Sequence, residues 1–230
     1  MSADIKENLV RIREKIEISC KKVGRNPDKV KLVAATKTVP VEKIREAIAA
    51  GVSIIGENRV QEAEKKISEL KDKNVEWHMI GYLQKNKVNK ALNLFKMIQS
   101  VSSLALAEKI NKSCQRINQK IPCLLEINIG RESTKSGFLE EELWEKLENL
   151  ANLPYLETKG LMVIPPFLEP EEVRPYFIRL REIKEKINQM KIPGLNPTEL
   201  SMGMSQDFVV AIEEGATMVR LGTAIFGPRA

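Results

Sequence analysis

One repeated pattern constrains the fold of this chain more than any other feature of its sequence. A short apolar run passes into a loop of small residues, and a helical pattern follows before the next run begins; Leu143, Leu147 and Leu150 show the helical spacing in one such gap. Short runs without polar alternation are typical of strands buried on both faces, so the pattern predicts a parallel sheet flanked by helices. Eight such runs occur, at Lys31–Ala35, Val52–Ile55, Trp77–Ile80, Phe95–Ile98, Cys123–Ile127, Gly160–Ile164, and from Leu200 and from Met218.

Eight consecutive strand–helix units predict an α/β fold that closes into a (β/α)8 TIM barrel. The alternative is an open, doubly wound sheet, which would carry a G-x-G-x-x-G turn after its first strand, and the chain has none there. The spacing of Ile5, Leu9, Ile12 and Ile16 adds an amphipathic helix ahead of the barrel. Because 230 residues suit one barrel and no linker interrupts the pattern, we expect a single domain over residues 1–230.

The charged residues are interleaved rather than grouped. The chain has 37 basic and 31 acidic residues and a net charge of +6. Segments such as Glu62–Lys66 and Arg181–Lys186 mix the two signs, which is typical of solvated helix faces. Aromatic residues make up only 5% of the chain, too few for the basic and aromatic surface of a nucleic-acid-binding protein, so we expect no nucleic-acid partner.

The cysteines and the single histidine indicate a cytoplasmic protein without a metal centre. Cys20, Cys114 and Cys123 are scattered, odd in number and outside any C-x-x-C spacing, as expected for buried thiols in a reducing compartment. With His78 as the only histidine, no zinc-ligand pattern exists. No apolar run is long enough to span a bilayer and the first helix is not a signal sequence, so we predict a soluble protein that does not bind membranes.

A barrel of this kind places the residues that follow its strands around one mouth, where such folds carry their chemistry. The loops after the seventh and eighth strands are the usual phosphate site of these barrels. Here those loops contain Ser205, Gly222 and Thr223, and small residues let backbone N–H groups approach an anion closely. The alternative is that Ser205 or Thr223 caps the next helix. The expected ring comprises Lys37, Asn58, Gly81, Ser102, Asn128, Pro165, Ser205 and Thr223.

Two cationic residues at this mouth could take part in chemistry. Lys37 follows the first strand, where partial desolvation frees the lone pair of an amine for a carbonyl; the alternative is a lysine that extends to water. Arg220 lies inside the apolar run of the eighth strand, where a guanidinium needs a partner. That partner is a ligand or, in a purely structural ion pair, Glu57 or Glu126.

Three further polar residues carry weaker signals. His78 lies within the third strand and is expected to be a packed, hydrogen-bonded core residue, with its neighbour Trp77 on the opposite face. Lys135 follows the fifth strand, either as a solvated loop lysine or as a second amine at the mouth. Asn58 follows the second strand and either lines the mouth or caps the next helix.

Several motifs together resemble those of the pyridoxal phosphate homeostasis protein family, the single-domain relatives of the alanine racemase barrel. The resemblance covers nearly the whole chain, and it implies a barrel that binds pyridoxal 5′-phosphate. One segment departs from the family, which often has His-Ser-Val-Asp where this chain has Gln99–Ser102, so contacts from that loop are not transferred. The motifs are Ala35–Thr38, Gly56–Arg59, His78–Lys87, Lys135–Gly137, Gly160–Met162, Leu200–Ser205 and Arg220–Gly227.

The resemblance also assigns the site. Lys37 would be the Schiff-base lysine, Arg220 would face the pyridine nitrogen, and Asn58 would belong to the cofactor-binding set. The phosphate would be held by Ser205, Gly222 and Thr223. No catalytic residue and no metal ligand is assigned.

Arg220 shapes the expected function. A protonated pyridine nitrogen donates a hydrogen bond, and a permanently charged guanidinium cannot accept it, so Arg220 disfavours the protonated ring. Related racemases take a second base from an added domain, whereas this sequence runs only three residues past Gly227. We therefore expect a monomeric protein of vitamin B6 homeostasis without significant catalysis, which delivers the cofactor to apoenzymes in transient contacts. The alternatives are a racemase-like enzyme using Lys37 with Tyr82 or His78, and a barrel enzyme in which Lys37 forms an imine with a phosphorylated metabolite.

Overall fold

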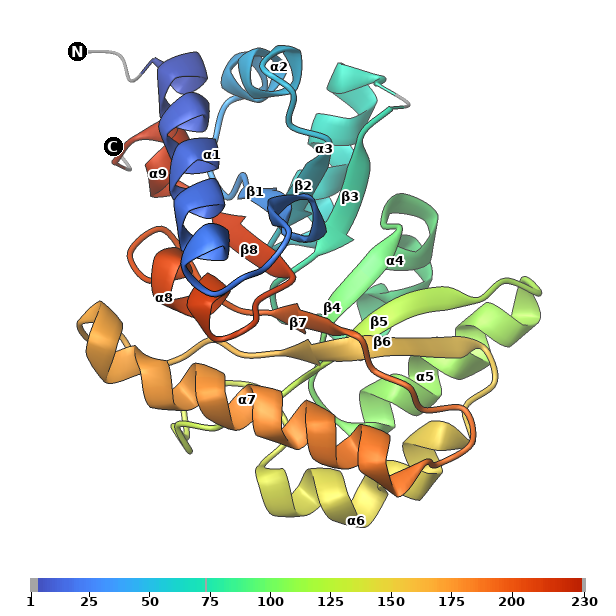
Figure 1. Cartoon of the computed structure of the whole chain (residues 1–230). Coiled ribbons are helices and arrows are strands. Elements are labelled where there is room, and N and C mark those ends of the chain that lie inside the picture. Colours follow the sequence, from blue (N-terminus) through green and yellow to red (C-terminus); the bar gives the residue numbers. More distant parts are fainter. Residues whose placement is uncertain (1–3, 73, 229–230) are drawn as a thin grey trace.

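The strands of this protein close into a barrel in the order of the sequence. The computed structural model describes residues 4–72 and 74–228. Every neighbouring pair of strands is parallel, and β1 pairs with β8 to close the sheet, which confirms the predicted (β/α)8 barrel (Figure 1). The strands are β1 (Lys31–Ala35), β2 (Ile54–Glu57), β3 (Glu76–Met79), β4 (Met97–Val101), β5 (Ile121–Glu126), β6 (Leu156–Met162), β7 (Glu199–Ser201) and β8 (Met218–Leu221).

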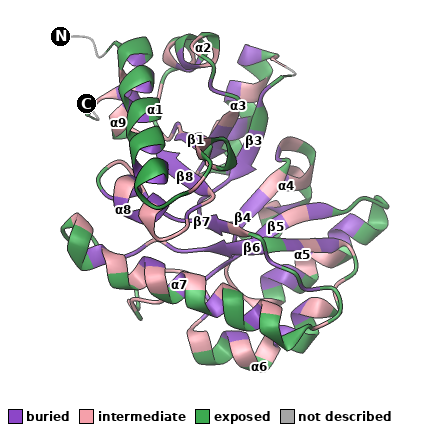
Figure 2. Ribbon diagram, viewed as in Figure 1, coloured by how far each residue is buried: buried purple, intermediate pink, exposed green. Residues whose placement is uncertain are grey.

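Helices connect the strands on the outside of the barrel. Figure 2 shows the buried strands at the centre and exposed residues along the outer faces of the helices. None of the described helices is long and apolar enough to cross a membrane. They are α1 (Ile5–Lys22), α2 (Val41–Ala49), α3 (Val60–Leu70), α4 (Val88–Leu94), α5 (Leu104–Arg116), α6 (Glu140–Ala151), α7 (Pro170–Met190), α8 (Phe208–Glu213) and α9 (Thr223–Phe226), with short 3-10 turns η1 (Pro27–Lys29) and η2 (Lys85–Lys87).

The predicted additional helix at the N-terminus is α1. Asp4 caps it by accepting a hydrogen bond from the Glu7 amide at 3.1 Å. Its apolar stripe of Ile5, Leu9, Ile12 and Ile16 is buried, and α1 lies along α8 and α9 in Figure 1. This helix therefore covers the side of the barrel where the first and last strands meet.

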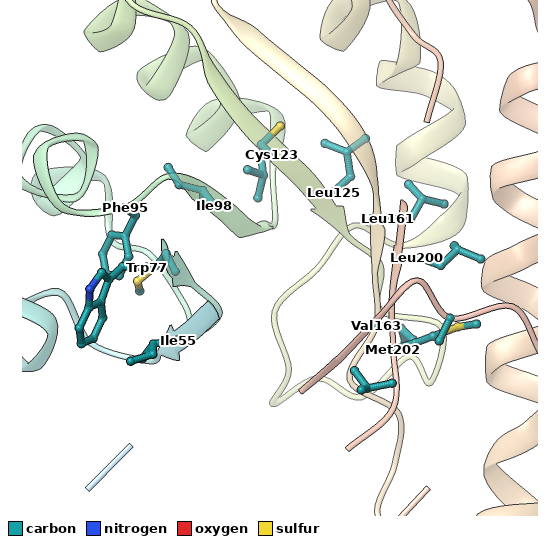
Figure 3. Packing of buried hydrophobic residues seen from close by; sticks show 14 of the residues in the cluster. Ile55, Trp77, Phe95, Ile98, Cys123, Leu125, Leu161, Val163, Leu200 and Met202 are labelled. Atoms are coloured by element: carbon teal, nitrogen blue, oxygen red, sulfur yellow. The ribbon is translucent and has the colours of Figure 1, made fainter. Parts of the chain in front are cut away.

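Side-chain alternation along the strands divides the core into two parts. The larger part lies between the strands and the helices, and Figure 3 shows it from Trp77 and Phe95 to Leu200 and Met202. The smaller part fills the barrel interior and consists of Val33, Ile80, Leu124, Met162 and Met218. Trp77 thus faces the helices, as predicted.

Most strands are displaced by one or more residues from their predicted bounds, and β4 and β6 extend furthest beyond them because polar residues lie within these two strands. β4 continues through Gln99 and Ser100, which are fully buried and hydrogen-bonded. β6 begins before Gly160 and includes Glu157–Lys159. A sequence pattern that looks for apolar runs misses such residues, because Gln99 and Thr158 find their partners, Ser201 and Cys123, on other strands.

Candidate functional site

Pairing between β1 and β8 brings Lys37 to the loop that follows β8. Ala34 pairs with Leu221, and a Cβ placed on Gly222 would lie 3.3 Å from the Ala35 carbonyl oxygen. Lys37 then lines one cavity of about 260 Å³ together with Gly222 and Thr223. Three of the predicted cofactor residues therefore share one pocket.

A second cavity, of about 590 Å³, lies on the other side of Lys37. It is also lined by Asn58, Gly81 and Tyr82, and the Tyr82 side chain is 63% exposed. A Cβ on Gly81 would lie 2.6 Å from the Asn58 carbonyl oxygen, so only glycine allows these two loops to approach. Within residues 4–72 and 74–228, no hydrogen bond or ion pair engages the half-buried Lys37 side chain. Its amine is thus available to a ligand in either cavity.

The two loops predicted to hold a phosphate are joined by Ser205. Its Oγ accepts hydrogen bonds from the amides of Gly222 at 3.3 Å and Ala224 at 3.1 Å. Neither residue caps the helix that follows it: α8 has no side-chain cap and the Thr223 side chain makes no capping bond, whereas Ser205 engages the first turn of the later helix α9. An exposed Thr223 hydroxyl beside Gly222 leaves this corner open to an anion.

Gly203 gives the loop after β7 its shape. Its φ is +93°, and a Cβ there would lie 2.6 Å from the Ala211 Cβ and 3.0 Å from the Phe208 Cα. The loop can therefore fold onto α8 only with glycine at this position. Gly203 also accepts the Arg220 amide through its carbonyl at 2.9 Å, which aligns the two loops.

Arg220 is buried, with 4% exposure, and is held by neutral groups. Nη1 donates to Ser201 Oγ at 2.7 Å and Nη2 donates to the Val163 carbonyl at 2.8 Å. The structural ion-pair alternative is wrong, because Glu57 pairs with Lys66 and Glu126 accepts from Ser136. Burial lowers the Arg220 pKa to about 10, partly offset by Glu126 and Asp207, so the guanidinium stays charged at neutral pH.

A buried polar cluster that no sequence pattern predicted contacts the backbone next to Lys37. The Lys66 ammonium donates to the Thr36 carbonyl and to Glu57 Oε1, each at 2.6 Å, and to Glu62 Oε1 at 2.7 Å. Glu62 Oε1 in turn accepts the Thr38 amide at 2.7 Å. Thr36, Glu57, Glu62 and Lys66, here called the Lys66 cluster, thus hold the backbone on both sides of Lys37.

The prediction that Glu62–Lys66 faces solvent is therefore wrong for Lys66, which is 6% exposed. Lys66 shares a helix face with Ala63 and Leu70, both buried. The spacing of three and four residues between Ala63, Lys66 and Leu70 could have indicated that Lys66 is buried. Burial raises the pKa of the Glu57 carboxyl, although its bonds to Lys66 and Thr36 act in the opposite direction.

His78 and Lys135 play structural roles in this arrangement, whereas Asn58 lines the second cavity beside Lys37. His78 is a packed core residue, as predicted, and lines a cavity with Lys31 and Glu76 at the strand N-termini, the end opposite Lys37. Lys135, whose side chain is 28% exposed, joins two loops by donating to the Pro165 carbonyl at 2.8 Å and pairing with Glu132 at 2.5 Å, so its amine is not free. Asn58 makes no side-chain cap at α3.

The chemistry available at this mouth is that of amines, amides and hydroxyls. Among the described residues, no group of histidine, cysteine and carboxylate side chains could hold a metal ion. The three cysteines are free and buried, and burial raises the Cys123 pKa to about 12, which leaves its thiol unreactive.

The whole chain is similar to proteins of one family. Residues 6–230 match the family described as alanine racemase, N-terminal domain. The pyridoxal phosphate homeostasis protein of Aquifex aeolicus is 47% identical over 224 residues, 97% of each chain. The structure of PipY from Synechococcus elongatus with PLP bound is 38% identical, covers 97% of this chain and 100% of its own, and superposes with a TM-score of 0.85.

More distant structures share the fold alone. An alanine racemase from Clostridium difficile has a TM-score of 0.70 at 16% identity, and this chain covers 56% of it. The close relatives are named homeostasis proteins rather than enzymes. From the full-length match to the family and the 47% identity to a curated member, the chain belongs to the alanine racemase N-terminal domain family and, within it, to the pyridoxal phosphate homeostasis proteins.

Proposed function

We propose that this protein holds pyridoxal 5′-phosphate at the C-terminal mouth of its barrel as a Schiff base with Lys37 and takes part in vitamin B6 homeostasis. The observation that carries the proposal is the uncommitted Lys37 amine between two cavities, one of which contains Gly222 and Thr223. The relatives' names and the PLP bound to PipY support the choice of ligand.

The residues at the mouth fit the parts of this cofactor. Ser205, Gly222 and Thr223 would receive the phosphate, because the Ser205 and Thr223 hydroxyls can donate to its oxygens and the Gly222 amide, now bonded to Ser205 Oγ, lies beside them. The Lys37 amine would form a C=N bond with the aldehyde carbon, and the aldehyde oxygen would leave as water. Asn58 borders the cavity on the other side of Lys37.

Arg220 supports a carrier rather than a catalyst. When bound, the cofactor supplies an electron sink through its ring, which is strongest when the ring nitrogen is protonated. A charged guanidinium can only donate hydrogen bonds, so Arg220 facing that nitrogen would favour the unprotonated ring. The protein would thus retain and transfer the aldehyde rather than activate amino acids.

A racemase-like activity is the second candidate function, and Tyr82 is the observation that favours it. Tyr82 lines the same cavity as Lys37, whereas His78 opens to the opposite end of the barrel. Tyr82 is therefore the residue to test as a second base, and the His78 version of this hypothesis is wrong on position. The open mouth also suits transient contact with apoenzymes, and we propose that the protein acts as a monomer. Its three free, buried cysteines support a reducing, cytoplasmic compartment.

A single preparation tests the proposed function. Pyridoxal phosphate is added to the purified chain, the imine absorbance is recorded, and borohydride reduction followed by peptide mass mapping locates the linkage. Lys37→Ala should abolish the band, while Lys43→Ala, which removes another lysine of the same cavity, should retain it. Label on Lys43, or no band in the wild type, would overturn the proposal.

Turnover is tested separately from binding. The loaded protein is offered a panel of amino acids, and racemisation is followed by chiral chromatography. A carrier should show almost none. Turnover at the rates of dedicated enzymes that is lost in Tyr82→Phe would favour the racemase-like activity. An imine band in the protein as isolated would argue against the third possibility, that Lys37 forms its imine with a phosphorylated metabolite.

A further inference from the structure

A line of buried polar side chains crosses the interior of the barrel. Arg220 on β8 donates to Ser201 Oγ at 2.7 Å, and Ser201 donates to Gln99 Oε1 on β4 at 2.6 Å. Gln99 Nε2 lies 2.9 Å from His78 Nδ1 on β3, and His78 Nε2 lies 3.5 Å from Glu76 Oε2. The first four are at most 4% exposed, and the surrounding interior is apolar. The line runs from the C-terminal end of the barrel to the cavity at the N-terminal end.

The chemistry of the groups gives this line a direction. A guanidinium can only donate, so the Ser201 hydroxyl accepts from Arg220 and turns its own proton to Gln99 Oε1. The Gln99 amide nitrogen then faces two acceptors, His78 Nδ1 and, at 3.6 Å, Met218 Sδ. His78 must therefore accept at Nδ1 and keep its proton on Nε2, toward the Glu76 carboxylate.

We propose that Ser201, Gln99 and His78 form an oriented hydrogen-bond relay that holds the Arg220 guanidinium at the mouth, with His78 fixed as its Nε2–H tautomer. These are positioning residues, because they act on a ligand only through Arg220. Contact between Arg220 and the cofactor ring rests on the proposed function; the tautomer of His78 and the polarity of the relay do not.

Two features show why packing alone does not explain the line. Ser201 and Val163 take one donor from each terminal nitrogen of Arg220, which fixes the plane of the guanidinium. Gln99 is the link between Ser201 and His78. Its amide has one accepting end and one donating end, so it transmits a single polarity, whereas a histidine facing His78 would permit either tautomer.

The single histidine makes the relay directly observable. Ring ¹⁵N labelling of histidine gives the two nitrogen signals of His78 alone. In the full chain without cofactor we expect Nε2 to appear as a protonated nitrogen with its attached hydrogen, and Nδ1 as an unprotonated one. Observation of the Nδ1–H tautomer would overturn the proposal.

Substitutions at the two links between His78 and Arg220 test the direction. Gln99→Glu replaces the donor to Nδ1 with an acceptor, so His78 should gain a proton on Nδ1. Ser201→Ala removes the link between Gln99 and Arg220 and should shift both ring signals. Ser100→Ala is the matched control, because Ser100 is equally buried but donates to the Gly81 carbonyl outside the relay.

If Ser201→Ala fails to fold, Ser201→Thr keeps the hydroxyl and should retain the wild-type ring signals. The effect on the cofactor is measured after pyridoxal phosphate is added. Ser201→Ala should change the absorption band of the bound cofactor, while Ser100→Ala should not. His78 signals that stay unchanged in Ser201→Ala would overturn the relay. A relay seen in the cofactor-free chain together with no imine band would instead overturn the proposed function.

Discussion

The Lys66 ammonium lies 2.6 Å from the carbonyl oxygen of Thr36, the residue that precedes Lys37. The same ammonium bonds Glu57 and Glu62, and Glu62 holds the amide of Thr38. Thr38 has φ +64°, a left-handed conformation that is costly for a β-branched residue. The Lys66 cluster therefore fixes a strained turn whose central residue is the predicted imine lysine.

Removal of Lys66 should destabilise the fold and disturb imine formation. Lys66→Met leaves the Glu57 carboxylate buried beside Thr36 without its cation. Breaking a buried ion pair in this way costs about 3 kcal/mol. We expect a loss of that size in the free energy of urea unfolding, and slower growth of the imine absorbance when cofactor is added.

Two further variants identify the cause. Lys65→Met removes a neighbouring exposed lysine and should leave both measurements unchanged. Glu57→Gln combined with Lys66→Met should recover part of the lost stability, since no buried charge then remains. A Lys66→Met variant as stable as Lys65→Met would show that the cluster is not a stabilising ion pair.

The fold was predictable because its signals are local. Most strands contain a short apolar run, the loops after them start with small or polar residues, and the spacing of helix residues needs only neighbouring positions. Closure of the barrel then predicted that Lys37 would meet Gly222 and Thr223, which lie far along the chain but on adjacent strands.

The rest of the site depends on contacts that no local pattern contains. Lys66 looks like surface charge until its partners Glu57 and Thr36 are placed against it. Gln99 interrupts an apolar strand, and only the pairing across the barrel with Ser201 explains it. The ion-pair alternative for Arg220 was wrong because a hydroxyl and a carbonyl satisfy its guanidinium.

Gly203 should be far less tolerant of substitution than another glycine with positive φ. Gly203→Ala places a Cβ 2.6 Å from the Ala211 Cβ, whereas Gly24→Ala, at φ +67°, meets nothing within 4 Å. Gly24→Ala should cost about 1 kcal/mol from the backbone alone. Gly203→Ala should lower the free energy of unfolding by about 2 kcal/mol more than Gly24→Ala does, because its Cβ overpacks the loop; urea unfolding measures both values. Equal costs would mean that the loop after β7 shifts freely.

Ser205 should matter more for ligand retention than for stability. Ser205→Ala removes a hydroxyl that would donate to the phosphate and that now holds the Gly222 and Ala224 amides in place. We expect about tenfold weaker binding of pyridoxal phosphate, equivalent to about 1.4 kcal/mol, by equilibrium dialysis. Ser103→Ala removes the serine cap of α5, outside the cavities of Lys37, and should lower stability without changing binding. Equal binding by the two variants would exclude Ser205 from the phosphate site.

His78 should make the fold less stable in acid. Burial lowers its pKa from 6.5 to about 4, although Glu76 on its own strand and Glu199 on β7 oppose the shift and Lys31 on β1 adds to it. The unfolded chain therefore binds a proton at a higher pH than the folded one. The neutral imidazole contributes its full stability above pH 6.5. This contribution falls as the pH drops from 6.5 to about 4, and the free energy of unfolding decreases by about 3 kcal/mol over that range.

The measurement is the difference between wild type and His78→Gln in the free energy of urea unfolding at each pH. Glu57, Glu126 and Asp207 have pKa values raised by burial, so they take up protons in the folded state and act in the opposite direction. They are present in both proteins, and the difference cancels them. The wild type should lose stability relative to His78→Gln from pH 6.5 downward, whereas parallel curves would show that the imidazole is solvated and that it is not locked between Gln99 and Glu76.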